Sequence, residues 1–494
     1  MEATHQMNKQ ELDDKLKQAA DELQRKKQRD LDELSDKVDH DAKNAFDFIS
    51  DNANKLRYVP ELGEWLTYDG KRWVIDTKGV AVLDAVTQRH RVESIAEYKR
   101  ALQEQDKTKR QQHNQRAKRL GNIGSIQAVV TLARADQRII ARHDELDANA
   151  WLLNADNGIV NLRNGQLQTH DPTQLMTKIA KVEYDPNAEC PQWQQFLDRI
   201  IPDTEVQDFL QRFIGSCLTG EIRDQYLVLF IGGGANGKSV FVEVLREMLN
   251  DYAAIIEPGD LVVTRNEPHP TSRLKLMGAR LATCNEVEGN ARLSDVKVKR
   301  LTGGDTLTGR GMGKDFIEFR PTFKPILIAN HKPPMQEQDE GIRRRLVVVP
   351  FNVTIPSHER NPDLKQELLK ELPGVLAWAV RGCLAWNQDG RLIQPNDVEN
   401  ATFNYLQDND TVQAFIDECC QLDPKAKETK GDFHKAYALW CERSGVTAKT
   451  TNAVSRQLKT KFGEVGGKAR SWLGVKVLTE HREHAQYEMN DELW

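Results

Sequence analysis

The chain has 494 residues, of which 39% are hydrophobic and 29% charged, and its formal net charge is −5, a size that predicts two to four domains with buried cores. The composition excludes a membrane-spanning protein, because no run approaches 18 apolar residues, and the N-terminus lacks the apolar core of a secretory signal. We therefore expect a cytoplasmic protein with no membrane partner, in which any nucleic-acid contact comes from a local basic patch.

The first 190 residues contain two predicted regions. Residues 1–45 are dense in Lys, Asp, Glu and Gln around a loose stripe of Leu and Val, which predicts one or two solvated helices. Residues 46–190 are predicted to form an α+β module. In it, aromatic and polar residues alternate around the Asp-Gly pair of "EWLTYDGKRWVID", and "GIVNLRNGQLQTH" turns at its Asn-Gly pair. Each of these two segments predicts a β-hairpin.

Residues 79–145 of this module have helical spacing and contain the charged run "YKRALQEQDKTKRQQHNQRAKRL". The run has eight Lys and Arg residues and two acidic residues. A nucleic-acid contact would use such a run, but a solvated helix face explains it more simply. The Pro-bearing segment "EYDPNAECPQW" then marks a boundary, which we place at residue 190.

A second predicted domain covers residues 191–395, where short apolar strands alternate with loops and helices. The strand segments are "YLVLFI", "RLATC", "KPILIAN" and "LVVVPF". Strands that are mixed with helices behind a phosphate-binding loop predict a three-layer α/β ATPase core.

Residues 396–494 are predicted to form a small, mainly helical domain that "SWLGVKVLTEH" closes. Cys419 and Cys420 are adjacent there, and two partly buried thiols on a helix explain them more simply than a redox pair. The seven cysteines include no C-x-x-C pair, which argues against a zinc ribbon or zinc finger. Their odd number fits a reducing compartment.

The stretch "FIGGGANGKSVFVEVL" satisfies the phosphate-loop pattern G-x-x-x-x-G-K-[ST] between a predicted strand and a predicted helix. Glycines let backbone N–H groups turn toward phosphate oxygens, and the helix N-terminus adds partial positive charge. Lys238 is expected to reach the β and γ phosphates of ATP, and Ser239 to ligate Mg²⁺. The residues expected to contact the nucleotide are Gly232, Gly233, Gly234, Ala235, Asn236, Gly237, Lys238, Ser239 and Val240.

Two further strand ends supply polar groups for ATP hydrolysis. "RLATCNEVEG" ends in acids, of which Glu286 is the first choice for polarising the attacking water. Glu288 either helps to hold Mg²⁺ or is an ordinary solvated acid. "KPILIANHKPP" ends in Asn330, whose amide can bond the γ-phosphate or the water. The alternative for Asn330 is that it opens a Pro-rich turn.

The segment "DEGIRRRLVVVPF" carries three consecutive arginines directly before a strand. An arginine that is inserted into a neighbouring subunit's ATP site stabilises the charge of the transition state. Arg344 and Arg345 are both candidates for this role, and the sequence does not choose between them. The alternative is a basic loop that touches nothing.

A candidate DNA contact lies between the acids and Asn330. "TLTGR" and "DFIEFR" flank "GMGK" and predict a hairpin with Lys314 near its tip. A lysine there can bind a DNA phosphate, and such a contact does not depend on the base sequence of the DNA. Lys299 and Arg310 are further candidates for DNA binding. A surface hairpin with ordinary solubilising charge is the alternative.

Taken together, these motifs resemble the phage, plasmid and poxvirus primase–helicase family, whose motor is a superfamily 3 AAA+ helicase. The motifs are "GGGANGKS", "CNEVEG", "VKRLTGGDTLTGR", "ILIANHKPP" and "GIRRRLVVVPF". "LRYVPELGEWLTYDGKRWV" is similar to the family's N-terminal module, so the resemblance covers roughly residues 45–480. It implies an α/β fold with an AAA+ P-loop ATPase core, an α+β N-terminal module and a C-terminal winged-helix-like domain.

The resemblance also implies roles for single residues. It assigns the Walker A motif to Lys238 and Ser239, the Walker B acid to Glu286, the sensor to Asn330, and the arginine pair to Arg344 and Arg345. Lys299 falls in the family's K-x-L-T-G-G-D motif, and Lys314 lies near the tip of its pore hairpin. The family commonly has an aromatic residue where this chain has Arg343.

The family implies a ring, usually a hexamer, that hydrolyses ATP between subunits and moves along single-stranded DNA, typically 3′ to 5′. The expected partners are single-stranded and forked DNA and a separate primase, initiator or polymerase. We expect no priming by this chain, because it shows no zinc-finger cysteines and no room for a polymerase domain before residue 45. The expected role is unwinding in phage, prophage or mobile-element replication. The alternatives are an ATP-regulated origin-binding or DNA-loading platform and a small-molecule kinase.

Overall fold

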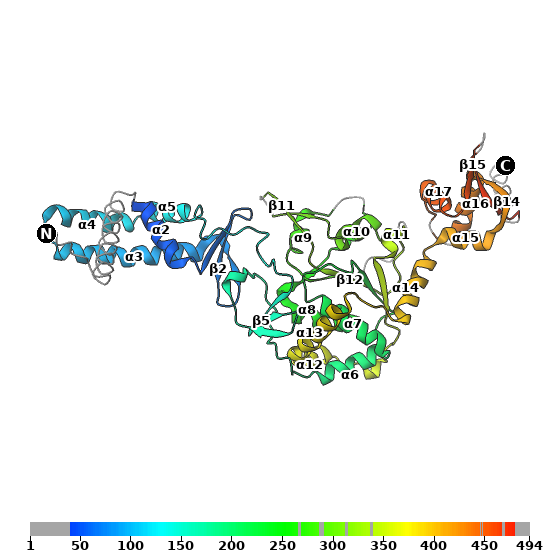
Figure 1. Ribbon diagram of the computed structural model, residues 1–494, viewed down its shortest axis with the longest axis horizontal. Coiled ribbons are helices and arrows are strands. Elements are labelled where there is room, and N and C mark those ends of the chain that lie inside the picture. Colours follow the sequence, from blue (N-terminus) through cyan, green and yellow to red (C-terminus); the bar gives the residue numbers. More distant parts are fainter. Residues whose placement is uncertain are drawn as a thin grey trace, which may run out of the picture. The chain divides into compact units, whose positions relative to one another are not determined.

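The computed structural model describes residues 40–264, 268–285, 291–311, 315–335, 339–444, 446, 448–466 and 470–479. The contacts of the chain divide it into two compact units (Figure 1). The N-terminal unit extends to Ala148 and includes Pro172–Thr177, and the second unit comprises Asn149–Asp171 and the chain from Lys178 onward. The helices predicted for residues 1–39 lie outside the described residues. No helix within the described ranges is long and apolar enough to cross a lipid bilayer.

The N-terminal unit combines helices with a small antiparallel sheet. Its elements are α2 His40–Asn52, β1 Leu56–Val59, β2 Glu64–Tyr68, β3 Trp73–Asp76, η1 Thr77–Gly79, α3 Val80–Gln103, α4 Lys107–Leu120, α5 Ile123–Ala133 and η2 Pro172–Gln174. The strands β2 and β3 form the first predicted hairpin, with Tyr68 opposite Trp73. Its turn is closed by Asp69, whose Oδ1 accepts the backbone N–H groups of Lys71 and Arg72, each at 2.8 Å.

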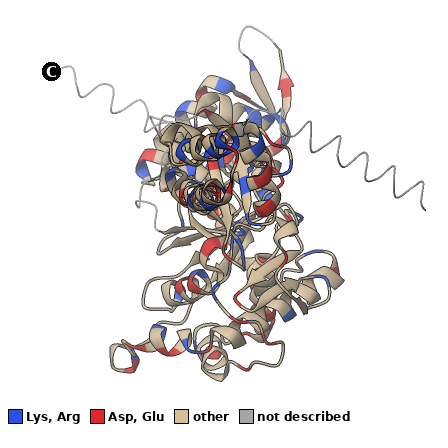
Figure 2. Ribbon diagram, turned by 90° about the vertical axis from the view of Figure 1, so that its left-hand side faces the viewer, with Lys and Arg blue, Asp and Glu red and all other residues tan. Residues whose placement is uncertain are grey.

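The predicted charged run forms the end of α3 and all of α4. Glu97 on α3 is 2% exposed and accepts hydrogen bonds from His113 Nδ1 and Arg100 Nη1, each at 2.6 Å. Burial raises its pKa, but the bond from His113 and the nearby Arg116 outweigh burial and hold the pKa of Glu97 below its ordinary value. Within the helices that face the viewer in Figure 2, α3 carries both basic and acidic residues, whereas the charged residues of α4 are all Lys or Arg. These features are those of a solvated helical hairpin with an internal ionic contact.

The second predicted hairpin belongs to the second unit. The strands β4 Leu152–Ala155, β5 Gly158–Asn161 and β6 Gln166–Gln168 form an antiparallel sheet, and Asn161 lies opposite Gln166 across the turn. The buried Arg280 donates from Nη2 to Leu152 O at 2.6 Å, and Gly220 N donates to Ala150 O at 2.9 Å. These long-range bonds explain why the compact units divide near residue 148 rather than at the expected boundary near residue 190.

A parallel sheet forms the centre of the second unit. Its strands are β7 Leu227–Ile231, β8 Ala253–Ile255, β9 Leu281–Asn285, β12 Lys324–Ala329 and β13 Leu346–Pro350. Within the described residues they lie in the order β13-β7-β12-β9-β8, and every neighbouring pair is parallel. The four predicted strand segments are thus confirmed as β7, β9, β12 and β13.

Both faces of this sheet are buried, as expected for a parallel sheet covered by helices. Along β7, Val228 and Phe230 join one apolar cluster, whereas Leu227 and Leu229 join the cluster on the other face. The flanking elements are α6 Pro191–Ile200, α7 Thr204–Ser216, α8 Lys238–Leu249, η3 Asn250–Tyr252, η4 Pro258–Asp260, α9 Pro270–Leu274, α10 Asp295–Thr302, α11 Glu340–Arg343, η5 Ser357–Glu359, α12 Leu364–Leu369, α13 Leu372–Asp389 and α14 Asn396–Asp408. The sheet and these helices form the predicted three-layer core.

The residues from 411 to 477 form what we call the C-terminal domain. Its elements are α15 Thr411–Cys419, β14 Cys420–Thr429, α16 Lys430–Arg443, α17 Thr451–Lys459, β15 Gly463–Val465 and β16 Ser471–Val477. The strands form an antiparallel sheet in the order β14-β16-β15. The domain is therefore α+β: it contains helices as predicted, and also a three-stranded sheet that the prediction of a small helical domain left out. The pattern of β14 is uninformative because only Glu428 among its ten residues is buried, so the strand lacks apolar alternation.

The adjacent cysteines do not share a helix as predicted. Cys419 ends α15 and is buried, whereas Cys420 begins β14 opposite Val477.

Candidate functional site

The loop from Gly232 to Gly237 joins β7 to α8 and has the backbone of a phosphate cradle. Gly234, Ala235 and Gly237 have φ angles of 94°, 49° and 82°. A Cβ on Gly237 would come within 2.6 Å of Ile200 Cγ2, and one on Gly232 within 2.3 Å of Phe351 O. Glycine is required at both positions, because any larger residue would collide with the packed loop.

Lys238 opens α8 and turns back over this loop. Its side chain is buried, and its Nζ donates to Gly232 O at 2.6 Å and to Asn236 Oδ1 at 3.0 Å. Asn236 in turn donates from Nδ2 to Phe351 O at 3.3 Å. The ammonium group is thus held against the loop that is expected to wrap a phosphate chain.

The cavity at this loop measures about 500 Å³. It is lined by Gly234 through Val240 and by Asn285 and Asn330. Asn285 ends β9 and Asn330 follows β12, so the carboxyl ends of three neighbouring parallel strands meet here. Ser239 is exposed into this space. The structure therefore brings together Lys238, Ser239 and Asn330 as predicted from the sequence. Glu286 and Glu288 lie outside the described residues.

Two charged residues of the lining had not been predicted. Glu243 and Arg246 extend the wall of the cavity along α8. They follow Ser239 by four and seven positions, and this spacing places all three on one helix face. The same spacing in the sequence could have identified both.

The donor set fits a nucleoside triphosphate with Mg²⁺. A glycine-rich turn, a helix N-terminus, a lysine ammonium and a serine hydroxyl are the groups that bind phosphate oxygens and their metal ion. Lys238 would bind the phosphate oxygens and Ser239 would ligate Mg²⁺. Asn330 would orient the terminal phosphate or the attacking water. Bound ATP would supply the phosphoryl group, and Mg²⁺ would neutralise its charge.

The arginine run lies at the opposite edge of the sheet. In the parallel pair of β7 and β13, Leu346 is opposite Leu227 and Pro350 is opposite Ile231. The phosphate loop follows the end of β7, whereas the arginines precede the start of β13. A five-residue strand is roughly 16 Å long. Arg343, Arg344 and Arg345 are accordingly absent from the described lining of the cavity.

The three arginines differ in their surroundings. Arg345 is 9% exposed, and it donates from Nη1 to Gly341 O at 2.7 Å and from Nη2 to Gln225 Oε1 at 3.1 Å. Burial, together with the neighbouring Arg344, lowers the pKa of Arg345. Arg344 is exposed, and within the described chain its guanidinium has neither a hydrogen bond nor an ion pair. Arg344 is thus the one of the predicted pair whose guanidinium can reach another molecule.

Lys299, a predicted DNA contact, lies on α10 and faces the arginine run. Its Nζ pairs with Asp295 at 3.6 Å and with Asp339, which caps the N-terminus of α11. Burial opposes ionisation of Asp339, but Lys299 and the backbone N–H of Ile342 hold the pKa of this carboxyl below its ordinary value. In this structure Lys299 therefore stabilises the start of the helix that carries the arginines.

The predicted DNA hairpin is formed by β10 Leu307–Arg310 and β11 Phe316–Phe319, which pair antiparallel. Arg310 and Phe316 are opposite each other and exposed, with the guanidinium 5.2 Å from the ring centroid. Leu307, Ile317 and Phe319 are buried beneath them. Lys314 lies outside the described residues. A cation and an aromatic ring on one exposed face are suited to a phosphate and a base.

Two family models match the chain. One, described as D5 N terminal like, matches residues 47–202, and the other, described as a family of unknown function (DUF5906), matches residues 230–345. The first model continues past the division of the compact units at residue 148. The second contains the phosphate loop, the hairpin and the arginine run.

Related proteins are found among viruses. The chain is 28% identical over 336 residues to a protein named "Putative helicase" of Acanthamoeba polyphaga mimivirus, in an alignment that covers 62% of this chain and 34% of the relative. It is 26% identical over 310 residues to a "Putative helicase" of Frog virus 3, covering 58% and 32%. The chain thus spans about a third of the length of these relatives. A solved structure of the C-terminal region of NrS-1 is similar with a TM-score of 0.44 and 12% identity, over 85% of this chain and 96% of the other.

Proposed function

Because the chain belongs to the phage and viral primase–helicase family, we propose that it is an ATP-dependent DNA helicase that works as a ring of identical subunits. One observation carries this proposal. The phosphate loop and the arginine run lie at opposite edges of one sheet. A subunit therefore cannot supply Arg344 to its own ATP, and the complete ATP site requires a second copy.

The order of the central strands supports an AAA+ core of the superfamily 3 type. Numbered along the chain, the described strands of the sheet lie in the order 5-1-4-3-2, with the phosphate loop after the first and Asn330 after the fourth. The helix–strand–helix–helix–strand–strand order of the C-terminal domain supports the winged-helix-like assignment. We propose a hexamer that moves 3′ to 5′ on single-stranded DNA.

In the proposed mechanism the chain's residues divide the work. Lys238 and the loop amides bind the phosphates, Ser239 holds the metal ion, and Glu286 and Asn330 orient the attacking water. Arg344 of the neighbouring subunit stabilises the charge that develops on the transferred phosphoryl group. The hairpin with Arg310 and Lys314 follows the DNA backbone in the ring's pore, where several copies concentrate positive charge despite the net charge of −5.

The proposal is tested by strand displacement on forks with either a 3′ or a 5′ single-stranded tail, with Lys238→Ala as the inactive control. We expect ATP-dependent displacement on the 3′-tailed fork, together with ring-shaped particles of six subunits in electron micrographs. ATP hydrolysis and DNA binding without displacement of either fork would favour a DNA-loading platform. ATP hydrolysis that DNA does not stimulate, by a monomer, would contradict both.

A further inference from the structure

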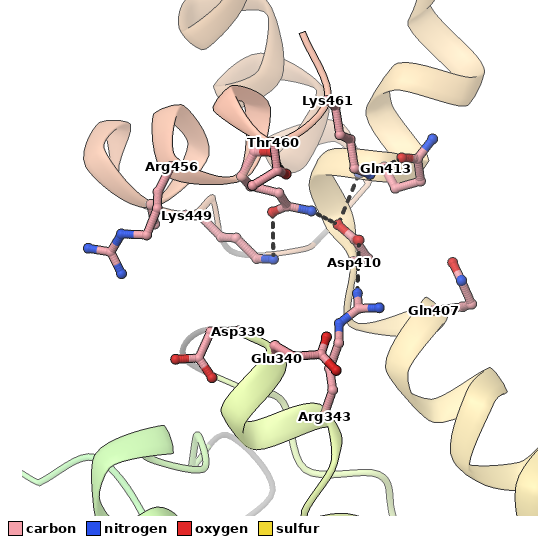
Figure 3. Close-up of a pocket in the computed structure, with 12 residues that line it drawn as sticks. Asp339, Glu340, Arg343, Gln407, Asp410, Gln413, Lys449, Arg456, Thr460 and Lys461 are labelled. Carbon is pink, nitrogen blue, oxygen red and sulfur yellow. Dashed lines mark hydrogen bonds and ion pairs between the residues drawn. The ribbon is translucent and has the colours of Figure 1, made fainter.

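A buried carboxylate joins the arginine run to the C-terminal domain. Asp410 lies between α14 and α15, and its side chain is 5% exposed. Its Oδ1 accepts from Gln413 N at 3.1 Å, which caps α15, and from Gln457 Nε2 of α17 at 2.5 Å. Its Oδ2 lies 3.5 Å from Nη2 of Arg343 on α11. Figure 3 shows Asp410 between α11 below it and α15 and α17 above.

The helix before Asp410 is fixed to the nucleotide-binding core. Thr402 of α14 accepts the backbone N–H of Val348 in β13 at 2.9 Å. Tyr405 donates its hydroxyl to Pro333 O at 2.7 Å, and Asn409 Oδ1 accepts from Met335 N at 3.1 Å. Pro333 and Met335 belong to the segment that follows Asn330. The backbone that carries Asp410 is thus held by contacts with β13 and with the segment that follows Asn330.

Several positively charged side chains lie around the carboxylate of Asp410. It adjoins a cavity of about 580 Å³ that is also lined by the cations Arg343, Lys449, Arg456 and Lys461. Among the described acids of this lining, Asp339 and Glu340 are exposed and Asp410 is buried. Loss of the Asp410 charge would remove the buried counter-charge of the half-buried Arg343, and removing one partner of an ion pair changes where the other side chain lies.

We propose that Asp410 is a positioning residue for ATP hydrolysis. It orients Arg343, and with it the adjacent Arg344, toward the ATP of the neighbouring subunit. Because the same carboxylate binds Gln457, this orientation depends on where α17 of the C-terminal domain lies. The inference rests on the proposed function, since it requires that Arg344 acts on a neighbour's ATP. A ligand that displaces α17 would change ATP hydrolysis, and by reciprocity ATP would change the affinity for that ligand.

The first test uses Asp410→Asn in the full chain. Asparagine has the same size and also caps helices well, so α15 keeps its cap while Arg343 loses the charge. We expect kcat for ATP hydrolysis by the assembled protein to fall about tenfold with an unchanged KM for ATP, because the Lys238 loop is untouched. The matched control is Asp408→Asn, which removes an exposed aspartate that pairs with Lys332 at 2.5 Å, and it should change neither constant.

A second variant changes the contact that Asp410 makes with the C-terminal domain. Gln457→Glu places a second carboxylate against Asp410 Oδ1 without altering any core residue, and it should lower kcat in the same way. In an Arg343→Gln background, Asp410→Asn should have little further effect, because the partner through which it acts is gone.

The outcomes separate the two proposals. A wild-type kcat in both Asp410→Asn and Gln457→Glu would overturn the positioning role. The same conclusion would follow if these variants changed kcat and KM equally, or if they lowered only the thermal stability of the protein. If Arg344→Ala abolishes hydrolysis while Asp410→Asn does not impair it, only this inference fails. If Arg344→Ala retains full hydrolysis, the proposed shared ATP site itself fails.

Discussion

The two edges of the central sheet differ in how much of their structure is local. At the carboxyl edge, the phosphate loop is built from consecutive residues, and Lys238 finds its partners two and six positions away, at Asn236 and Gly232. At the amino edge, Arg345 binds Gln225 and Arg343 pairs with Asp410, which are 120 and 67 positions away. The lysine at the first edge is thus held by nearby residues, whereas the arginines at the second are held by distant parts of the chain. We therefore expect that mutations at the first edge weaken nucleotide binding, and that mutations at the second edge remove the contribution of the arginine to hydrolysis without weakening binding.

The largest expected effect is at the carboxyl edge. Lys238→Ala removes the ammonium that is held against the phosphate loop, and ATP hydrolysis should fall by more than about a thousandfold, with nucleotide binding also weakened. Steady-state hydrolysis and binding of a fluorescent ATP analogue measure the two quantities. Hydrolysis within tenfold of the wild type would show that this loop is not the site of the reaction.

A comparable loss in rate, but not in binding, is expected at the amino edge. Arg344→Ala should lower kcat by about a thousandfold and leave nucleotide affinity near the wild-type value, because an inserted arginine acts mainly on the transition state. Arg345→Ala is the matched comparison. It removes a buried guanidinium with two bonds, so it should lower the melting temperature, whereas Arg344→Ala should not. Reversal of this pattern would exchange the roles of the two arginines.

Two glycines of the phosphate loop test how tightly this edge of the sheet is packed. Gly237 has φ +82° and its added Cβ would lie 2.6 Å from Ile200 Cγ2, whereas a Cβ on Gly233 would meet nothing within 4 Å. Gly237→Ala should therefore destabilise the fold by about 1–3 kcal/mol, and Gly233→Ala by less than about 1 kcal/mol. Chemical denaturation measures both. Equal stabilities would mean that the loop is not packed as the structure has it.

The sequence was sufficient where structure is local and insufficient where it is not. Short apolar runs identified four strands of the central sheet, and Asp-Gly and Asn-Gly pairs located two hairpins, since these signals lie within a few residues. The ion pair of Lys299 with Asp339 and that of Arg343 with Asp410 had no such signal. The boundary near residue 148 depends on Arg280, which binds the carbonyl of a residue 128 positions earlier. The exposed strand β14 was missed because it buries no regular apolar face.

The smallest effect on ATP hydrolysis is expected in the N-terminal unit. Glu97→Gln removes a buried carboxylate that binds His113 and Arg100, and should destabilise this unit by about 1–3 kcal/mol while kcat stays unchanged. The pKa of Glu97 is lower in the folded chain than in the unfolded chain, so its contribution is present above the unfolded pKa and is lost as the pH falls through the folded value. Denaturation of wild type and variant between neutral and acidic pH should show a difference that shrinks toward low pH. A constant difference would contradict the ionic role of Glu97.

The central claim is that one subunit's loop and another subunit's arginine form each ATP site. It is tested most directly by mixing two inactive full-length variants, Lys238→Ala and Arg344→Ala. In mixed assemblies, an intact loop from the Arg344→Ala subunit meets an intact arginine from the Lys238→Ala subunit. We predict that ATP hydrolysis is recovered on mixing, with a maximum near equal amounts. A mixture that stays as inactive as its components, although the variants assemble together, would contradict the shared site.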